Sequence, residues 1–213
     1  MPITIQPLPR LVTLATQPKR IIIGLVGLPG SGKTTLATQL QQQCAHQTPT
    51  INLTVLSMDG FHLSKAQLAQ QPDPEQALAR RGAPWTFDAT GLVQKIRQLK
   101  AHTGTVTWPI FEHAVGDPVA DAIEVTPYNQ LILIEGLYLL YREDDWRGLD
   151  GLFDEIWYLD TAPELAEQRL INRHQQAWGL TSEQARARIA SNDAKNAALV
   201  FNRRMGADYF VAS

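Results

Sequence analysis

The feature that most constrains the fold is a glycine-rich octapeptide that follows a continuous apolar run. Residues 27–34 read Gly-Leu-Pro-Gly-Ser-Gly-Lys-Thr and match the pattern G-x-x-x-x-G-K-[S/T]. The apolar run at residues 21–26 is typical of a strand buried on both faces, and a helix is expected from Gly32 onwards. A glycine loop between such a strand and a helix predicts an α/β domain that binds a triphosphate.

The residue types in this loop suit the binding of phosphate and of a divalent cation. Glycines let backbone N–H groups point inward at phosphate oxygens, and the following helix adds the positive end of its dipole. Lys33 supplies a mobile cation for the β and γ phosphates, and the Thr34 hydroxyl is a hard oxygen ligand for Mg²⁺. We therefore expect ATP and Mg²⁺ as cofactors. The residues expected to hold the nucleotide are Gly27, Leu28, Pro29, Gly30, Ser31, Gly32, Lys33, Thr34 and Thr35.

Four further apolar runs predict the rest of a sheet, and they lie at residues 54–58, 131–134, 155–159 and 208–211. Strands that alternate with helices favour a doubly wound parallel sheet, here of five strands with helices on both faces. The length of 213 residues and a hydrophobic content of 44% suit one domain. Residues 1–19 contain four prolines that interrupt regular structure, so we assign them as an N-terminal extension of a single domain at residues 20–213.

Charge and composition argue against several classes of partner. A net charge of -2 lacks the basic character of proteins that bind DNA or RNA. Cys44 is the only cysteine, which excludes an intrachain disulfide and fits a reducing interior. No apolar stretch approaches the roughly 18 residues of a membrane span. We expect a soluble, cytoplasmic protein with a small-molecule partner and neither a polynucleotide nor a membrane partner. The oligomeric state is left open, with a homodimer as one option.

Three motifs outside the loop resemble those of the uridine kinase, phosphoribulokinase and bacterial pantothenate kinase superfamily. They are Ser57-Met58-Asp59-Gly60-Phe61-His62, the segment Arg81-Gly82-Ala83-Pro84 with Phe87-Asp88, and Ile134-Glu135-Gly136-Leu137. The resemblance spans residues 21–212, and the chain is most similar to members labelled fructose-transport or uridine-kinase-like. It implies a P-loop kinase that moves the γ-phosphoryl group of ATP to an alcohol of a nucleoside, a sugar or a pantothenate-like metabolite.

Two carboxylates lie at the ends of predicted strands, where open α/β sheets gather their ligands. The resemblance implies that Asp59 accepts the proton of the acceptor hydroxyl; a plain Asp-Gly turn is the alternative reading. Glu135 ends a buried apolar run, and a carboxylate there suits Mg²⁺ or its bound waters. Thr34 and Glu135 therefore form the predicted metal site.

Two arginines lie four residues apart on the helix that begins near Pro163. Arg169 and Arg173 therefore share one helix face, and the resemblance implies that this helix belongs to a lid at about residues 163–195 that closes over ATP. A solvated basic face is the alternative. With Lys33 and Asp59, the two arginines complete the predicted catalytic set.

The acceptor site is the least determined part of the sequence. Besides Asp59, the resemblance points to His62, Arg81, Phe111 and His113, although His113 could equally be a surface or structural residue. The chain lacks the Tyr-Asp-Phe run of uridine kinases, the length of phosphoribulokinases and much of the insertion of pantothenate kinases. The acceptor is therefore left open, and an ATP-hydrolysing regulatory switch that acts on a protein partner is the alternative function.

Overall fold

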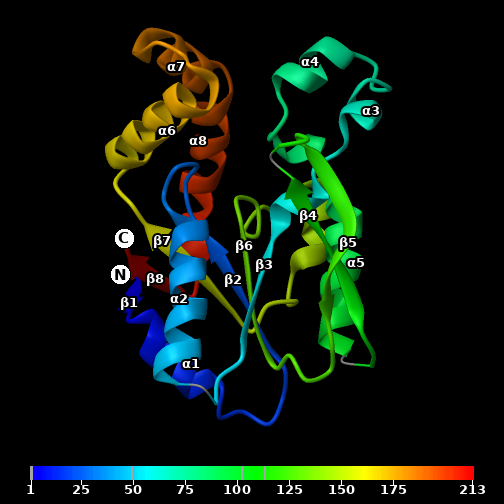
Figure 1. The fold of residues 1–213 in the computed structure, drawn as a ribbon, viewed down its shortest axis with the longest axis vertical. Helices are drawn as coiled ribbons and strands as arrows, with labels where there is room; N and C mark the ends of the chain where they lie inside the picture. The colour runs from blue at the N-terminus through cyan, green and yellow to red at the C-terminus, as the bar shows by residue number, and fades with distance from the viewer. Residues whose placement is uncertain (1, 49, 102, 113) are drawn as a thin grey trace.

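A computed structural model describes residues 2–48, 50–101, 103–112 and 114–213. Its centre is a parallel sheet of six strands in the order β1-β8-β7-β2-β6-β3 (Figure 1). The strands are β1 (Ile3–Ile5), β2 (Ile21–Val26), β3 (Leu53–Ser57), β6 (Leu131–Gly136), β7 (Glu155–Asp160) and β8 (Tyr209–Ala212). The α/β class and the parallel sheet are as the sequence predicts.

The prediction of five strands was wrong, because the N-terminal extension adds a sixth. β1 pairs with β8 in parallel, with Ile3 beside Tyr209 and Ile5 beside Val211. The prolines do not interrupt this short strand: Pro7 opens helix α1 (Pro7–Leu14), where a missing N–H removes no helical hydrogen bond. The extension is therefore part of the sheet and of the core.

Two apolar layers cover the two faces of the sheet. Successive residues of a strand point to opposite faces, so the residues of β2 divide between the layers. Ile21, Ile23 and Leu25 pack with α1 and α2 (Lys33–Gln47). Ile22 and Val26 belong to the other layer, which includes residues of α5 (Ala89–Ala101) and α8 (Ala194–Arg203). Helices on both faces were predicted, and this is confirmed.

Two pairs of helices lie beyond the carboxyl ends of the strands. Figure 1 shows α6 and α7 on one side of this edge and α3 and α4 on the other. The remaining helical bounds are η1 (Met58–Phe61), α3 (Lys65–Leu68), α4 (Pro74–Ala79), η2 (Pro84–Thr86), η3 (Asp144–Leu149), α6 (Pro163–Trp178), α7 (Ser182–Arg188), the π-helical turn η4 (Ile189–Asp193) and η5 (Arg204–Gly206). Within the described ranges, no helix has the length and apolar character needed to cross a bilayer.

An antiparallel hairpin, which was not predicted, forms a separate two-stranded sheet. It consists of β4 (Val106–Glu112) and β5 (Asp117–Val125), and its register shifts between Trp108 and Ile110. The Trp108 side chain is fully buried, and its Nε1 donates a hydrogen bond to the Ser57 carbonyl at 2.9 Å. This anchor holds the hairpin against the carboxyl end of β3.

Candidate active site

The phosphate-binding loop lies between β2 and α2, as the sequence predicts. Gly30 and Gly32 have φ values of 77° and 98°, which L side chains rarely adopt. A Cβ atom on Gly30 would lie 2.3 Å from the Ala166 carbonyl oxygen of α6. The curl of the loop therefore depends on glycine, and the loop packs directly against α6, the first helix of the predicted lid.

Buried polar groups in the loop suit a bound phosphate. Lys33 is only 8% exposed, and its Nζ donates to the carbonyl oxygens of Gly27 and Leu28, each at 3.1 Å. The buried Ser31 hydroxyl has no hydrogen-bond partner in the described part of the chain. A buried polar group without a partner costs free energy, and a phosphate oxygen would satisfy it. The loop therefore fits the triphosphate that its sequence predicts.

Glu135 links the loop to the neighbouring strand. It lies in β6 and is 5% exposed. Its Oε1 accepts hydrogen bonds from the Ser57 hydroxyl at 2.7 Å and from the Thr34 hydroxyl at 3.3 Å. Carboxylate and hydroxyl oxygens are the hard ligands that Mg²⁺ prefers. The two predicted metal residues are thus brought together. Ser57, whose role was not predicted, lies in the motif that resembles the kinases.

The charged groups of the site shift one another's pKa. Burial lowers the pKa of Lys33, and the carboxylates of Glu135 and Asp59 oppose this shift. Burial is also the largest cause that raises the pKa of Glu135; the negative charge of Asp59 adds to it, whereas Lys33 opposes it. The positive charge of Arg173 further lowers the pKa of Lys33. These four side chains therefore form one electrostatic cluster.

Asp59 lies in η1, the short turn that directly follows β3. Its backbone N–H donates to the Ser57 hydroxyl at 3.2 Å, which caps the turn. At the next residue, a Cβ atom on Gly60 would lie 2.2 Å from the Pro109 carbonyl oxygen. The hairpin therefore packs closely on the turn that carries Asp59, and Gly60 makes this approach possible.

The predicted pair of lid arginines faces the phosphate-binding loop. Arg169 Nη1 donates a hydrogen bond to the Ser31 carbonyl at 2.8 Å. Arg173 is exposed, yet its charge affects Lys33, so it lies on the same side of α6. The four-residue spacing places both residues on one face of the helix.

Four predicted acceptor-site residues lie together beside the loop. The ring centroid of His62 is 4.0 Å from that of Phe87 and 4.8 Å from that of Phe111. His62 Nδ1 lies 2.8 Å from the Asp59 carbonyl oxygen, and the Arg81 guanidinium lies 5.2 Å from the Phe111 ring centroid. The fifth, His113, lies outside the described residues.

Arg81 is mainly engaged by the protein itself. Its Nη2 donates to the Leu63 carbonyl at 2.8 Å and to Asp117 Oδ1 at 2.7 Å, and its Nη1 donates to the Gly116 carbonyl at 2.5 Å. Its Nε is buried without a hydrogen-bond partner in the described chain. Arg81 therefore fastens the hairpin turn, and Nε and the second N–H of Nη1 are the donors for which no partner is seen in the described residues.

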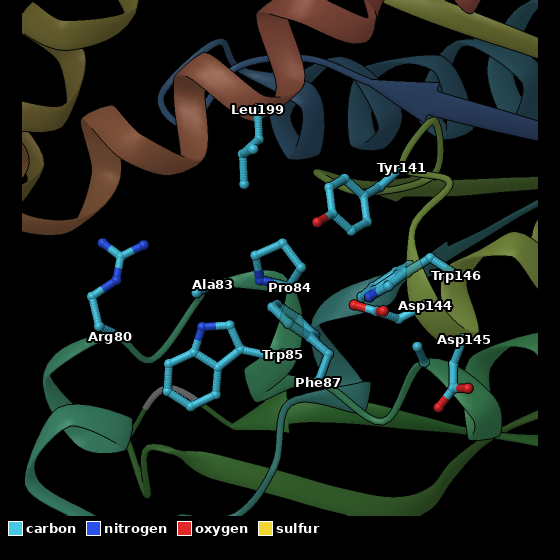
Figure 2. Close-up of a pocket in the computed structure, with 11 residues that line it drawn as sticks. Arg80, Ala83, Pro84, Trp85, Phe87, Tyr141, Asp144, Asp145, Trp146 and Leu199 are labelled. Atoms are coloured by element: carbon cyan, nitrogen blue, oxygen red, sulfur yellow. The ribbon is translucent and has the colours of Figure 1, made fainter. Parts of the chain in front are cut away.

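Residues 80–88 include the predicted acceptor residue Arg81, and we call them the acceptor loop for that reason. A cavity of about 380 Å³ is lined in part by this loop (Figure 2). Figure 2 shows Trp85 and Phe87 of the loop between Arg80 on one side and Asp144 and Asp145 on the other. The Phe87 ring contacts the Trp146 ring in the cavity wall at a centroid distance of 6.0 Å. Because Phe87 also contacts His62, it separates the cavity from the cluster around Asp59.

We expect Gly30→Ala to weaken nucleotide binding by at least about tenfold, because the new Cβ atom would collide with α6 and displace the loop. Titration with a fluorescent ATP analogue measures the change. Gly151→Ala is the matched control, since Gly151 also has a positive φ, of 68°, but a Cβ atom there meets nothing within 4 Å. Both variants carry a left-handed backbone penalty of about 1–2 kcal/mol. Equal affinities in the two variants would contradict the prediction.

Comparison with known proteins places the whole domain beside kinases. Residues 22–208 match the family model described as Phosphoribulokinase / Uridine kinase family. The chain is 39% identical over 194 residues to a proposed uridine kinase from Schizosaccharomyces pombe, covering 90% of this chain and 82% of that protein. It is 42% identical over 154 residues to an ATP-dependent kinase-like protein from Aspergillus versicolor, covering 70% and 89%.

A solved structure matches over almost the full length of both chains. It is a proposed fructose transport system kinase from Silicibacter sp. TM1040, with a TM-score of 0.84, 33% sequence identity and coverage of 98% of this chain and 99% of that chain. The match therefore extends over nearly the whole chain.

Proposed function

Because the chain belongs to the phosphoribulokinase/uridine kinase family of phosphotransferases, we propose that it transfers the γ-phosphoryl group of ATP to an alcohol group of a small metabolite. The observation that carries this proposal is the cluster of Lys33, Asp59 and Glu135 at the carboxyl edge of the sheet. It combines a cation for phosphate, a carboxylate for Mg²⁺ and a second carboxylate for a proton. The name of the Aspergillus versicolor relative supports ATP as the donor.

In the proposed reaction, the phosphate-binding loop holds ATP, and Glu135 and Asp59 have separate roles. Lys33 and the loop amides bind the phosphates. Thr34 and Glu135 would hold Mg²⁺, which would neutralise charge on the phosphate oxygens. Asp59 takes the proton of the acceptor hydroxyl as that oxygen bonds to the γ phosphorus. The bond from the γ phosphorus to the β–γ bridging oxygen breaks, and ADP leaves.

The lid arginines stabilise the negative charge that moves during the transfer. Arg169 is held next to the phosphate-binding loop by the Ser31 carbonyl, so its side chain loses little conformational entropy when the nucleotide binds. Arg173 adds a second positive charge near Lys33. Such groups lower the barrier because they are oriented before the reaction begins.

The acceptor is proposed only as a class: a nucleoside, a sugar or a pantothenate-like alcohol. Its contacts are proposed to come from His62, Arg81, Phe111 and His113, which offer an aromatic surface and hydrogen-bonding groups. We further propose a cytoplasmic enzyme without a polynucleotide or membrane partner. The net charge of -2 supports the absence of a polynucleotide partner, and a homodimer is compatible with this proposal.

The test is a coupled assay of ADP release from Mg²⁺-ATP. Candidate acceptors are nucleosides, sugars, sugar phosphates, glycerate and pantothenate, each assayed with wild-type protein, Lys33→Ala and Asp59→Asn. ADP release that requires one acceptor class, and that both variants lose, supports the proposal and identifies the acceptor. A regulatory switch instead predicts slow hydrolysis that requires Lys33 but responds to no acceptor. That result would overturn the proposal.

A further inference from the structure

The acceptor loop is joined to α8, the helix that follows the predicted lid, by partly buried hydrogen bonds that centre on Asn196. This residue of α8 is 2% exposed. Its Nδ2 donates to the Gly82 carbonyl at 3.1 Å, and its Oδ1 accepts from Arg80 Nη2 at 3.3 Å. The Tyr138 hydroxyl donates to the same Gly82 carbonyl at 2.6 Å. Both ends of one buried amide are therefore used to hold the acceptor loop.

The π-helical turn η4 adds a second set of contacts to the same loop. Asn192 Nδ2 donates to the Arg81 carbonyl at 2.9 Å, and Arg80 Nη1 donates to the Ser191 carbonyl at 2.9 Å. A π turn widens a helix locally, and such turns are frequent at functional sites. Here the turn presents a backbone carbonyl and a side-chain amide to the loop.

The same turn is fixed to the helix that carries the lid arginines. His174 Nε2 of α6 lies 3.1 Å from Asp193 Oδ2 of η4. Arg169, on the same helix, contacts the Ser31 carbonyl of the phosphate-binding loop. Apolar contacts join α6 to α7 and η4 through Leu170, Ile171, Ala185 and Ile189. A continuous set of contacts thus runs from the phosphate-binding loop through the lid to the acceptor loop.

At its other end, the acceptor loop reaches the proposed catalytic base. Phe87 contacts the His62 ring, and His62 contacts the Asp59 carbonyl. Gly82 has a φ of 102°, and its N–H is held by the Thr86 hydroxyl at 2.9 Å, so the loop has a defined conformation. A displacement of its lid-side end would therefore move the residues beside Asp59.

We propose that Asn196 is a positioning residue that couples nucleotide binding at the lid to the arrangement of the acceptor loop. The proposal rests on the proposed function, since it takes residues 80–88 as the acceptor side of a kinase. Nucleotide held by the lid arginines fixes α6 and η4, and Asn196 transmits this order to the Gly82 carbonyl. ATP binding thereby prepares the acceptor site, and coupling of this kind is commonly worth about 5–150-fold in affinity.

Asn196→Asp tests the coupling without changing the size of the side chain. The carboxylate keeps an acceptor for Arg80, but it loses the N–H donor and places an oxygen against the Gly82 carbonyl. The measurement is hydrogen exchange of amides in residues 80–88, with and without Mg²⁺ and a non-hydrolysable ATP analogue. In the wild-type protein the analogue should slow exchange by about tenfold, and in Asn196→Asp by less than about twofold.

The matched control is Asn202→Asp, the same substitution at an exposed position of α8, which should behave as the wild-type protein does. Arg80→Gln removes the donors to Ser191 and Asn196 and should also reduce the coupling, which covers the case in which Asn196→Asp fails to fold. Affinity for the analogue should stay within about twofold in every variant.

Unchanged protection of the loop in Asn196→Asp would overturn the inference. Where Asn196→Asp loses analogue binding through misfolding, Arg80→Gln decides, and unchanged protection in that variant would overturn the inference. The hydrogen-exchange experiment needs only the nucleotide analogue, so it measures the coupling before any acceptor is known. With the acceptor from the ADP-release assay, Asn196→Asp should raise the KM for the acceptor about tenfold while kcat changes less than about threefold. Failure of the proposed function would appear differently, as no acceptor-dependent turnover in the wild-type protein.

Discussion

Lys33→Ala is expected to reduce acceptor-dependent ADP release by about 10²–10³-fold, because it removes a pre-oriented cation from the migrating phosphoryl group. The Lys33 side chain is held in the loop by the Gly27 and Leu28 carbonyls, so its charge is already at the phosphate site. The affinity of the Lys33→Ala variant for Mg²⁺-ATP should also fall. Initial rates at saturating acceptor, with titration of the nucleotide, measure both effects.

Lys19→Ala is the matched control for this variant. Lys19 is an exposed lysine that pairs with Asp154, before β2 rather than after it. Its loss should leave turnover within about twofold of the wild-type rate, since exposed ion pairs contribute little. Turnover of Lys33→Ala at the wild-type rate would show that the loop does not hold the transferred phosphate.

Asp59→Asn is expected to reduce phosphoryl transfer by about 10²–10⁴-fold, the usual contribution of a positioned general base. The amide keeps the shape of the side chain but cannot accept the proton of the acceptor hydroxyl. Nucleotide affinity should remain within about twofold, because Lys33 and the loop stay in place. Single-turnover measurements with bound ATP separate the transfer step from binding.

One further readout and one matched control make the Asp59 prediction specific. Removal of this negative charge should lower the pKa of Glu135, because the charge of Asp59 contributes to raising it. Asp160→Asn is the control: Asp160 is an exposed carboxylate at the end of β7, on the same edge of the sheet, and its loss should leave the transfer rate unchanged. If Asp59→Asn lost nucleotide affinity rather than the transfer step, that result would contradict the role of Asp59 as the base for the acceptor hydroxyl.

The parts of the site that the sequence predicts are those that depend on local patterns. Buried strands such as Ile21–Val26 are continuous apolar runs, and in a parallel sheet their carboxyl ends meet at one edge. The positions of Asp59 and Glu135 follow from that geometry. The glycine loop and the four-residue spacing of Arg169 and Arg173 are equally local.

The features that were missed depend on contacts between distant segments. β1 has only three residues, none of them buried, so it carries no apolar run that would predict a strand. Pro109 and the register shift beside it interrupt the alternating pattern that would predict the hairpin. The partners of Asn196 lie more than a hundred residues away in the chain, as do those of Asn192. A single sequence gives no signal for such pairs.

The hairpin β4–β5 also has a consequence for how enzymes of this design diversify. It forms its own two-stranded sheet, so changes along it leave the hydrogen-bond ladder of the six-stranded sheet intact. Trp108, Val106 and Val125 provide buried anchors at its base. In the proposed kinase, a library randomised between residues 114 and 120 is therefore expected to change acceptor selectivity while the six-stranded sheet and the Pro109 contact with Gly60 stay intact.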